Sequence, residues 1–537
     1  MRTGRRRRPS GQAAGLLAAM ALTASCTAGT GVTGGSEQGS GKAISYEVGM
    51  ISPRPGGNPV DGGTLTFGAY SEPTVLDPAR TIVAGSTGGV SMAAIYDVLM
   101  RYDTSSGEVV PQLAKALEHN ADHTKWTLTL RDGVTFSDGT PLNAAAVKWS
   151  IERYVELGAT DAALWSANVT GIATPDEHAV VFRLKRTWPS FAFMLAGGPG
   201  MIVARSAEEE GFTPVGAGPF VFDHHAPGEE IVLRSREDHW DGAAHLDQLR
   251  VIFLDSAETR LDSLRQGGIQ AGFFRDPPAI EQAVGDGYAG FMNLVSLGNV
   301  AVINAAPGRP GADPRIRKAM HQAIDPQVIH ERAYAGADLG SKAVFPEFSR
   351  WHTDTEPLPY DPKAARALVH QAKADGFDGV IRYTDAQDPA SRATALAVKS
   401  MLERVGFTVE LDLVRSVPDQ ISTVAVEGDY DVAGWGISWR EAGPYARMFA
   451  TLHSAGNLSV GMHTGPEMDT LIERFQQAST AEEQRAAMRG IQQLWNKTVP
   501  ALVYGPTPEL LTWSTSLRGV EGTLNSMVLL DEAWLAR

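Results

Sequence analysis

The sequence predicts an α/β fold that is divided into more than one lobe. Short segments in which apolar and polar residues alternate, as in strands, are interleaved with longer segments whose apolar residues recur at helical spacing. Between residues 380 and 413 a strand, a helix and a second strand follow one another, which is a strand–helix–strand unit. The body from residue 62 onward holds about 475 residues, more than one hydrophobic core usually serves, so we expect two or three lobes.

The individual elements follow from local patterns in chain order. Gly62 to Gly68 alternates as a strand, and so does Trp126 to Leu130. Asp132-Gly133 and Asp138-Gly139 are turn signals on either side of a short apolar segment. Further strands are predicted at 180–184, at 231–234, from 380 onward and at 407–413. Helices are predicted at 92–99, 143–154, 315–324, 360–372, 391–405, 467–477 and 481–497.

The first 26 residues have the pattern of an export signal that ends in the only cysteine of the chain. Five arginines lie within residues 2–8, and a short apolar run from Ala13 to Leu22 follows. That run is shorter than the about 20 residues that span a bilayer. Cys26 after Ala24-Ser25 resembles the bacterial lipobox, although Thr23 stands where that motif prefers Leu or Val. This resemblance implies that residues 1–25 are removed and that Cys26 is acylated.

Composition limits the remaining possibilities. Residues 26–60 are rich in Gly, Ser, Thr and Pro, which indicates a flexible tether between the acylated cysteine and the body. With 47 basic and 62 acidic residues, removal of the five signal arginines leaves a net charge of 42 − 62 = −20. An acidic protein repels phosphate backbones, so a nucleic-acid partner is not expected. The single cysteine excludes a disulfide framework and a cysteine-based metal site.

A set of motifs recurs in order over roughly residues 62–510. They are Gly63-Thr64-Leu65-Thr66, Glu72-Pro73, Leu76-Asp77-Pro78, Trp126 to Leu142, Pro214 to Phe220 with Trp240, Asp313 to Met320, Ala323-Ile324-Asp325, Tyr360 to Ala365, Gly428 to Asp431 and Gly434-Trp435-Gly436. Taken together, they resemble the bacterial extracytoplasmic solute-binding proteins of family 5, which serve peptide and nickel ABC importers.

The resemblance implies a type II periplasmic-binding-protein clamshell with three lobes and a hinge of two chain crossings. Lobe I would combine 61–105, 205–300 and 500–537, lobe II would be the insertion 106–204, and lobe III would be 301–499. Ligand between lobes I and III would stabilise the closed form, which alone contacts it from both sides. The implied protein is a lipid-anchored monomer on the outer face of the cell membrane. It would capture oligopeptides without a cofactor and deliver them to ABC permease subunits.

The resemblance also implies a ligand site. In peptide-binding relatives an aspartate after the Gly-Trp pair binds the ligand's ammonium group, and that place falls on Ser438 here, with Glu441 as a possible replacement. The arginine that binds the carboxylate in dipeptide-specific members falls at or near Asp385, so both anchors for a free dipeptide are in doubt. The expected ligand-binding residues are Glu72, Gly434, Trp435, Gly436, Ile437, Ser438, Trp439, Glu441 and Tyr445.

Two kinds of contact are expected from these residues. Main-chain groups of 434–437 would pair with an extended peptide as an added strand, and Trp435, Trp439 and Tyr445 would either wall the cleft or belong to the core of lobe III. Arg447 is either an ion pair at the surface or hinge, or a clamp for a carboxylate.

Other functions remain as alternatives. The same fold could bind an oligosaccharide, a metal chelate or haem, or could act as a peptide-signal sensor. The pairs His224-His225 and His321 with His330 lack metal-ligand spacing, so no metal site is expected. An enzyme is not expected, because Gly436 to Arg440 lacks the second glycine of a nucleophile elbow and no His-Glu-x-x-His motif occurs.

Lipidation at Cys26 can be tested directly. The mature protein should begin at Cys26 and carry lipid, so Cys26→Ala should move the protein from the membrane fraction to the soluble fraction. The intact mass of membrane-extracted protein measures the cleavage site and the acyl chains. A soluble product that begins at another residue, or an unchanged membrane fraction for Cys26→Ala, would contradict this prediction.

Overall fold

The structure is a computed structural model that describes residues 46, 48–54, 56–209, 211–254, 256–415 and 417–536. All of these residues belong to the second of two compact units, Ile44–Arg537. The predicted signal peptide 1–25, Cys26 and the tether up to residue 45 lie outside the described residues. Within the described part, no helix is long and apolar enough to cross a membrane.

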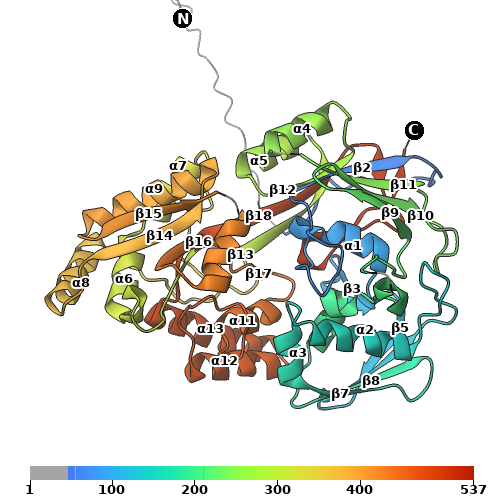
Figure 1. Ribbon diagram of the computed structural model, residues 1–537, viewed down its shortest axis with the longest axis horizontal. Helices are drawn as coiled ribbons and strands as arrows, with labels where there is room; N and C mark the ends of the chain where they lie inside the picture. Colours follow the sequence, from blue (N-terminus) through green and yellow to red (C-terminus); the bar gives the residue numbers. More distant parts are fainter. Residues whose placement is uncertain are drawn as a thin grey trace, which may run out of the picture. The chain divides into compact units, whose positions relative to one another are not determined.

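Two long strands run through the body and connect its parts (Figure 1). β13 (Ala289–Ile303) and β18 (Ala501–Trp513) pair antiparallel, from Ala289 opposite Trp513 to Val302 opposite Ala501. In the described residues they are neighbours inside a twelve-stranded sheet, ten strands of which follow the order β15-β14-β16-β13-β18-β12-β2-β11-β10-β9. The short strands β1 (Gly49–Ile51) and β17 (Trp439–Arg440) also pair with β13.

Lobe I contains one end of this sheet. β2 lies parallel to β11 and β12, whereas β9, β10 and β11 form an antiparallel meander. The strands are β2 (Thr64–Ala69), β9 (Phe220–Ala226), β10 (Glu230–Ser235), β11 (Gln248–Phe253) and β12 (Ala271–Phe274). The helices are α1 (Gly89–Tyr96), which is buried at every residue, α4 (Ala257–Arg265) and α5 (Pro277–Gly285). The C-terminal segment adds the small pairs β19 (Leu517–Arg518) with β22 (Trp534–Leu535) and β20 (Glu521–Thr523) with β21 (Met527–Leu529).

Lobe II is a separate antiparallel sheet with two helices. Its strands lie in the order β5-β6-β8-β7 and are β5 (Ala114–His119), β6 (Lys125–Leu130), β7 (Val169–Ala173) and β8 (Ala179–Leu184). The side chain of Asn143 accepts a hydrogen bond from the third residue of α2 (Ala144–Glu156) and so caps it, and α3 (Ala162–Asn168) follows. The hairpin of β3 (Met100–Asp103) and β4 (Glu108–Pro111) spans the predicted boundary at 105/106.

Lobe III contains the other end of the long sheet. Its strands are β14 (Val380–Ala386), β15 (Thr408–Val414) and β16 (Val432–Trp435). Four of its helices begin with an aspartate that caps the first turn, followed by proline at the first helical position: α6 (Pro314–Ala323), α7 (Pro326–Ala333), α8 (Pro362–Ala374) and α9 (Pro389–Arg404). α10 (Val417–Ile421) continues into a π-helix over Ser422–Glu427. The remaining helices are α11 (Tyr445–Leu452), α12 (Pro466–Gln477) and α13 (Ala481–Thr498).

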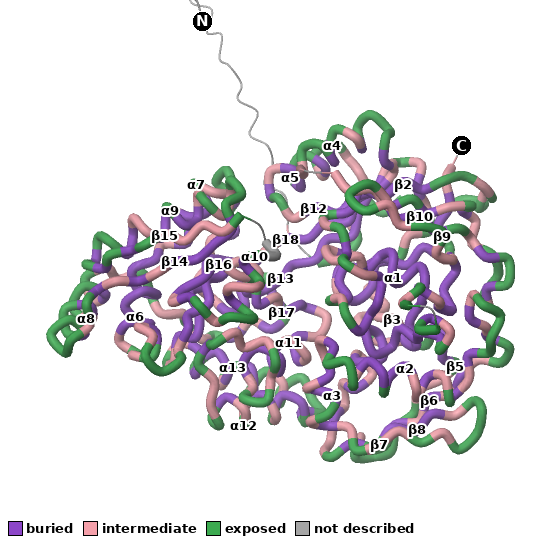
Figure 2. Tube along the Cα trace, viewed as in Figure 1, coloured by how far each residue is buried: buried purple, intermediate pink, exposed green. Residues whose placement is uncertain are grey.

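Buried side chains form several cores, and one of them crosses a lobe boundary. Trp165 and Phe182 of lobe II belong to the same buried cluster as Trp439, Phe475 and Trp495 of lobe III. Lobe I and the sheet of lobe III have their own clusters. Figure 2 shows the buried residues concentrated along the long sheet and at this junction, with exposed residues at the outer turns. Lobe II is therefore packed against the α11–α13 bundle.

The predicted α/β class is confirmed, and so is the parallel strand–helix–strand unit, which is β14, α9 and β15. The predicted helices of lobe III all form, with ends that differ by a few residues at most. The sequence did not predict β13 and β18. The exact lobe boundaries stay a prediction.

A buried ion pair between lobes I and II gives a stability prediction. Asp77 is fully buried and accepts hydrogen bonds from both terminal nitrogens of Arg153 on α2, at 3.0 and 2.7 Å. Removal of one partner leaves a buried charge, so Arg153→Ala should lower the free energy of unfolding by about 3–5 kcal/mol. Urea unfolding followed by circular dichroism measures this change.

Lys148→Ala is the matched control on the same helix. The ammonium group of Lys148 makes an exposed ion pair with Glu152 at 3.7 Å, and such helical pairs contribute about 0.5 kcal/mol or less. Equal losses for Arg153→Ala and Lys148→Ala would contradict the role assigned to the buried pair.

Candidate functional site

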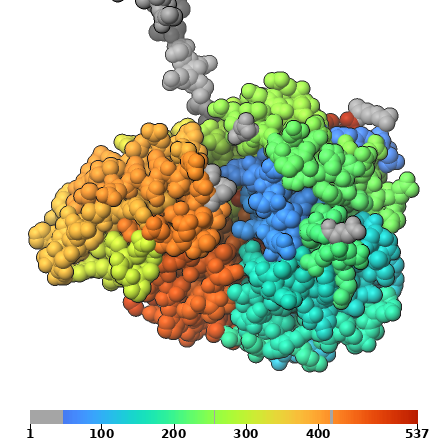
Figure 3. Space-filling view, viewed as in Figure 1, coloured from blue at the N-terminus to red at the C-terminus, as the bar shows by residue number. Residues whose placement is uncertain are grey.

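A cavity lies where lobes I, II and III meet, and we call it the interlobe cavity. It encloses about 1210 Å³ of empty space, part of which is open to solvent. Lobe I contributes residues 82–84 and 524–525, lobe II contributes Gly107 and residues between 154 and 198, and lobe III contributes 350–351, 440, 442–447, 475 and 484. Figure 3 shows that the surface is hollowed between the orange part of lobe III and the blue part of lobe I. Ligand sites of proteins are clefts of this kind and of comparable size.

Aromatic rings from two lobes form the apolar walls of the interlobe cavity. Tyr445, at the start of α11, meets Trp188 of lobe II edge to face with ring centroids 5.4 Å apart. It also stacks on Phe475 of α12 at 6.4 Å, and Phe475 in turn contacts Trp351. Phe193 of lobe II also lines the cavity. The rings offer apolar, stacking surfaces to a ligand.

Arg440 brings positive charge to the cavity and is fixed by the long strand β18. Its guanidinium group donates to Glu509 of β18 at 2.5 Å and to the hydroxyl of Ser526 at 2.9 Å. Arg275 lies 3.5 Å from the other oxygen of Glu509. Burial by itself would raise the pKa of Glu509, but the two guanidinium groups lower it below its ordinary value. Glu509 is therefore a carboxylate shared by two arginines.

Asp161 and Arg447 face the same space from different lobes. Asp161 of lobe II accepts a hydrogen bond from the hydroxyl of Tyr154 at 3.3 Å. Burial raises the pKa of Asp161, and the charge of Arg447 opposes this change. Burial lowers the pKa of Arg447, which lies on α11, and the charge of Asp161 opposes that change. No ion pair joins them in the described structure.

Arg350 is the remaining cation of the lining. Its guanidinium group stacks over the ring of Trp351 at 4.7 Å and donates to the carbonyl of Ala442 at 2.5 Å. Its backbone N–H donates to the carboxylate of Glu441 at 3.2 Å. The contacts of Arg350 thereby fix the segment around Glu441 and Ala442, which leads into α11.

The structure separates the residues that were expected to bind ligand. Tyr445 lines the interlobe cavity, and Glu441 lies next to its lining but points to Arg350 and to the hydroxyl of Ser296. Burial raises the pKa of Glu441. Trp439 has no exposed surface, packs on Phe345 and Trp495, and donates to Thr451. Of the two alternatives for Trp439, a wall of the cleft or the core of lobe III, the structure shows the core.

The segment 434–438 lies on β16 and in the turn that follows. Gly434 and Trp435 pair with Ala301 and Val300 of β13, and the carbonyl of Gly434 also accepts from Gln420 at 2.7 Å. Ile437 is buried in the core, Gly436 is exposed, and Ser438 has a left-handed backbone with φ +63. None of these five residues is part of the cavity lining. An added peptide strand at Gly434 would compete with Gln420.

Glu72 lies apart from these residues, in lobe I. Its carboxylate accepts from His225 at 2.7 Å and from the backbone N–H of Gly228. It therefore fixes the turn between β9 and β10 and is not part of the cavity lining. Conversely, no sequence pattern indicated Asp161, Trp188 or Arg440 as cavity residues, because they come from segments that are distant in sequence.

No metal site is evident in the described residues, where no group of three or more His, Cys, Asp or Glu is placed to hold an ion. His225 binds Glu72, and His224 contacts its neighbour Asp223 at 2.9 Å. His321 is buried in the core of lobe III, where burial lowers its pKa to about 3.

Known proteins are similar to this chain over most of its length. A family model described as bacterial extracellular solute-binding proteins, family 5, middle region, matches residues 108–459. The chain is 26% identical over 449 residues to the probable D,D-dipeptide-binding periplasmic protein DdpA of Escherichia coli (strain K12). That match covers 78% of this chain and 84% of DdpA.

Two solved structures have a similar fold. The oligopeptide-binding protein AppA from Bacillus subtilis, in complex with a nonapeptide, aligns with a TM-score of 0.76 and 19% identity over 89% of this chain and 100% of AppA. The binding protein AgaA from A. tumefaciens R10, in complex with agropinic acid, aligns with a TM-score of 0.75 and 22% identity over 88% of this chain and 99% of AgaA.

Asp385, which stands near the place of a family arginine, gives a pH-dependent prediction. It is 5% exposed, and burial raises its pKa from 3.8 to about 7. Its carboxyl group accepts hydrogen bonds from Ala386 and Gln420 at 2.9 and 3.1 Å. An acid with a higher pKa in the folded chain binds its proton more tightly when folded, so the free energy of unfolding falls as pH rises from about 4 to about 7.

Asp385→Asn removes the ionisation and should therefore stabilise the protein at pH 8, by up to about 4 kcal/mol. The gain should be less than half as large at pH 5. Denaturant midpoints at the two pH values measure the difference, and Asp241→Asn, at an exposed carboxyl group of lobe I, should show no such pH dependence. A loss of stability for Asp385→Asn that is equal at both pH values would contradict the prediction.

Proposed function

This chain belongs to the bacterial extracellular solute-binding proteins of family 5, and from that premise we propose that it captures oligopeptides for an ABC importer. The family consists of binding proteins and not of enzymes, and its fold is the type II clamshell with three lobes. In the proposed cycle, a peptide enters between the lobes, stabilises the closed form and is delivered to the permease subunits.

The observation that carries this proposal is the interlobe cavity itself. Its walls come from all three lobes, so a ligand inside it contacts lobe II and lobe III at once and favours the arrangement in which both lobes are close. Its aromatic walls accept side chains of different shapes, which suits peptides of variable sequence. The similarity to the probable D,D-dipeptide-binding protein DdpA and to AppA, which was solved with a nonapeptide, supports the same ligand class.

The location of the protein is part of the proposal. The signal-like residues 1–25 and Cys26 would place it on the outer face of the cell membrane, held there by lipid on Cys26. The Gly- and Ser-rich segment up to residue 60 would serve as the tether to the body. We propose that the protein acts as a monomer.

A non-peptide ligand is the second candidate. Three arginine side chains line the cavity, and the similar AgaA was solved with agropinic acid. Oligosaccharides, metal chelates and haem belong to this alternative, as does a role in sensing a peptide signal.

Ligand class can be tested on the full-length protein purified in detergent. Mass spectrometry of the native preparation identifies what co-purifies, and thermal shift measures binding of a panel of peptides of two to nine residues. A ligand at 100 times its dissociation constant should stabilise the protein by about 2.7 kcal/mol, and peptides should do so with little side-chain selectivity.

Maltotriose and a nickel–histidine chelate are the comparison ligands in the same panel. A thermal shift with either of them and none with peptides would reject the peptide proposal and favour the second candidate.

A further inference from the structure

Arg447 differs from the other charged residues of the interlobe cavity, because no described residue forms a hydrogen bond or ion pair with its guanidinium group. It lies in the first turn of α11 and lines the cavity. Among the described residues, no hydrogen bond or ion pair involves its guanidinium group, whereas Arg440 binds Glu509 and Arg350 binds the carbonyl of Ala442. A guanidinium group that is partly removed from water is costly without a partner, so a ligand group is the natural partner for Arg447.

The charges around Arg447 favour an anion. Arg275 and Arg440 share the single carboxylate of Glu509, which leaves one positive charge in excess. Asp161 and Glu509 are the acids whose charges attract Arg447, but burial favours the neutral form of Asp161, and Glu509 is already shared by two arginines. Arg440 also lines the cavity, and its positive charge repels that of Arg447. An anion at Arg447 would relieve this repulsion.

The backbone at the start of α11 points to the same kind of ligand. The residue before the helix is Pro444, and its side chain makes no capping hydrogen bond. The first N–H groups of a helix carry a partial positive charge and bind anions when no side chain caps them. Residues 442–447 line the cavity, so this end of α11 and the guanidinium group of Arg447 are exposed to the same ligand.

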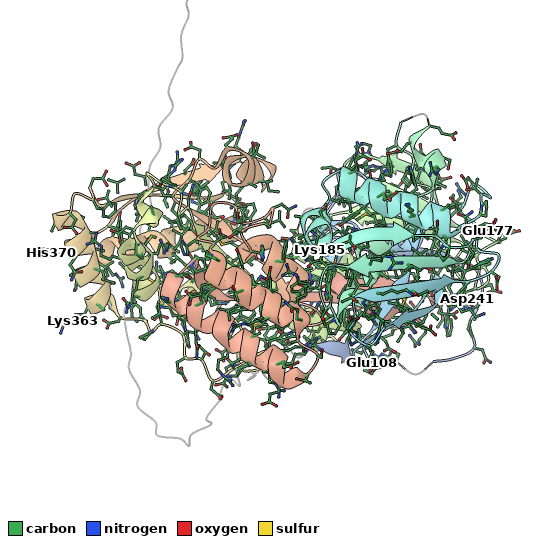
Figure 4. The ribbon with its side chains drawn as sticks, turned by 90° about the horizontal axis from the view of Figure 1, so that it is seen from below. Glu108, Glu177, Lys185, Asp241, Lys363 and His370 are labelled. Carbon is green, nitrogen blue, oxygen red and sulfur yellow. The ribbon has the colours of Figure 1, made fainter. Side chains whose placement is uncertain are left out.

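Aromatic rings line the same cavity as this cationic position. Trp188, Phe193 and Phe475 line the cavity with it, and Met194 and Leu524 add further apolar surface. Of the residues labelled in Figure 4, Lys363 and His370 of α8 point outward at one end of the molecule, and Glu177 and Asp241 at the other. The interlobe cavity thus combines a cationic position with apolar walls.

We propose that Arg447 binds a carboxylate of the ligand and that the cavity selects acids in which an apolar, ring-sized group lies next to that carboxylate. In a peptide this would be the C-terminal carboxylate beside a bulky last residue, so selectivity for side chains is expected at the last residue and not along the rest of the peptide. The inference rests on the proposed function, because it assigns the ligand of the same cavity, but a small aromatic acid would satisfy the same contacts.

Isothermal titration calorimetry on the full-length protein tests the inference with matched acids and amides. The peptide probes are Ala-Ala-Ala-Phe, its N-acetyl form and its C-terminal amide, and the non-peptide probes are 3-phenylpropionate and 3-phenylpropionamide. Wild-type protein should bind each acid about 30-fold or more tightly than its amide, as expected for a charged pair that is shielded from water. N-acetylation should have little effect.

Variants at Arg447 assign the preference to this residue. Arg447→Gln should remove the preference for acids over amides, and Arg447→Lys, which keeps the charge, should retain part of it. Arg489→Gln, at an exposed arginine of α13, should leave the preference unchanged. Circular dichroism of each variant checks that it is folded.

The outcomes separate this inference from the peptide proposal. Tight binding of the tetrapeptide and of its amide alike would leave the peptide proposal standing and overturn the carboxylate inference. A preference for 3-phenylpropionate over its amide without any peptide binding would support the carboxylate inference and overturn the peptide proposal. Retention of the acid preference by Arg447→Gln, or no binding of any acid, would also overturn the inference.

Discussion

β13 and β18 lie side by side and pair with each other over most of their length. At one end β18 also pairs with β12 of lobe I, and at the other end β13 pairs with β16 of lobe III, so a single hydrogen-bonded sheet passes through both lobes. The chain enters lobe III along β13 and returns along β18. Any movement of one lobe against the other must therefore be absorbed by these two strands, which are irregular near Asn299.

The candidate site depends on the same strands. Glu509 lies on β18 and binds Arg440, which β17 places against β13, and Ser526 and Arg275 of lobe I contact the same carboxylate. This buried network fixes the segment that leads to Tyr445 and Arg447. Lobe II supplies the facing wall with Asp161 and Trp188. The position of the site thus follows from the hinge, and a ligand in it contacts elements on both sides of that hinge.

Much of the fold could be predicted because its signals are local. The helices predicted at 315–324 and 360–372 form, each after an Asp-Pro pair, and the alternating segment 126–130 is a strand. β13 and β18 were not predicted, since strands buried on both faces show no alternation and β18 contains two prolines, which argue against a central strand. The segment around Tyr445 was indicated by its resemblance to a family motif. Asp161 and Trp188 were not, because tertiary contacts alone bring them there.

The central claim is that one ligand contacts lobes II and III together beside the hinge. Hydrogen–deuterium exchange of the full-length protein, with and without a saturating peptide that has been shown to bind, measures this most directly. The account predicts that exchange slows in 442–452 of lobe III and in 188–198 of lobe II at the same peptide concentration, and also in β13 and β18. Protection confined to one lobe, or protection around 434–438 with none at 442–452, would contradict the account.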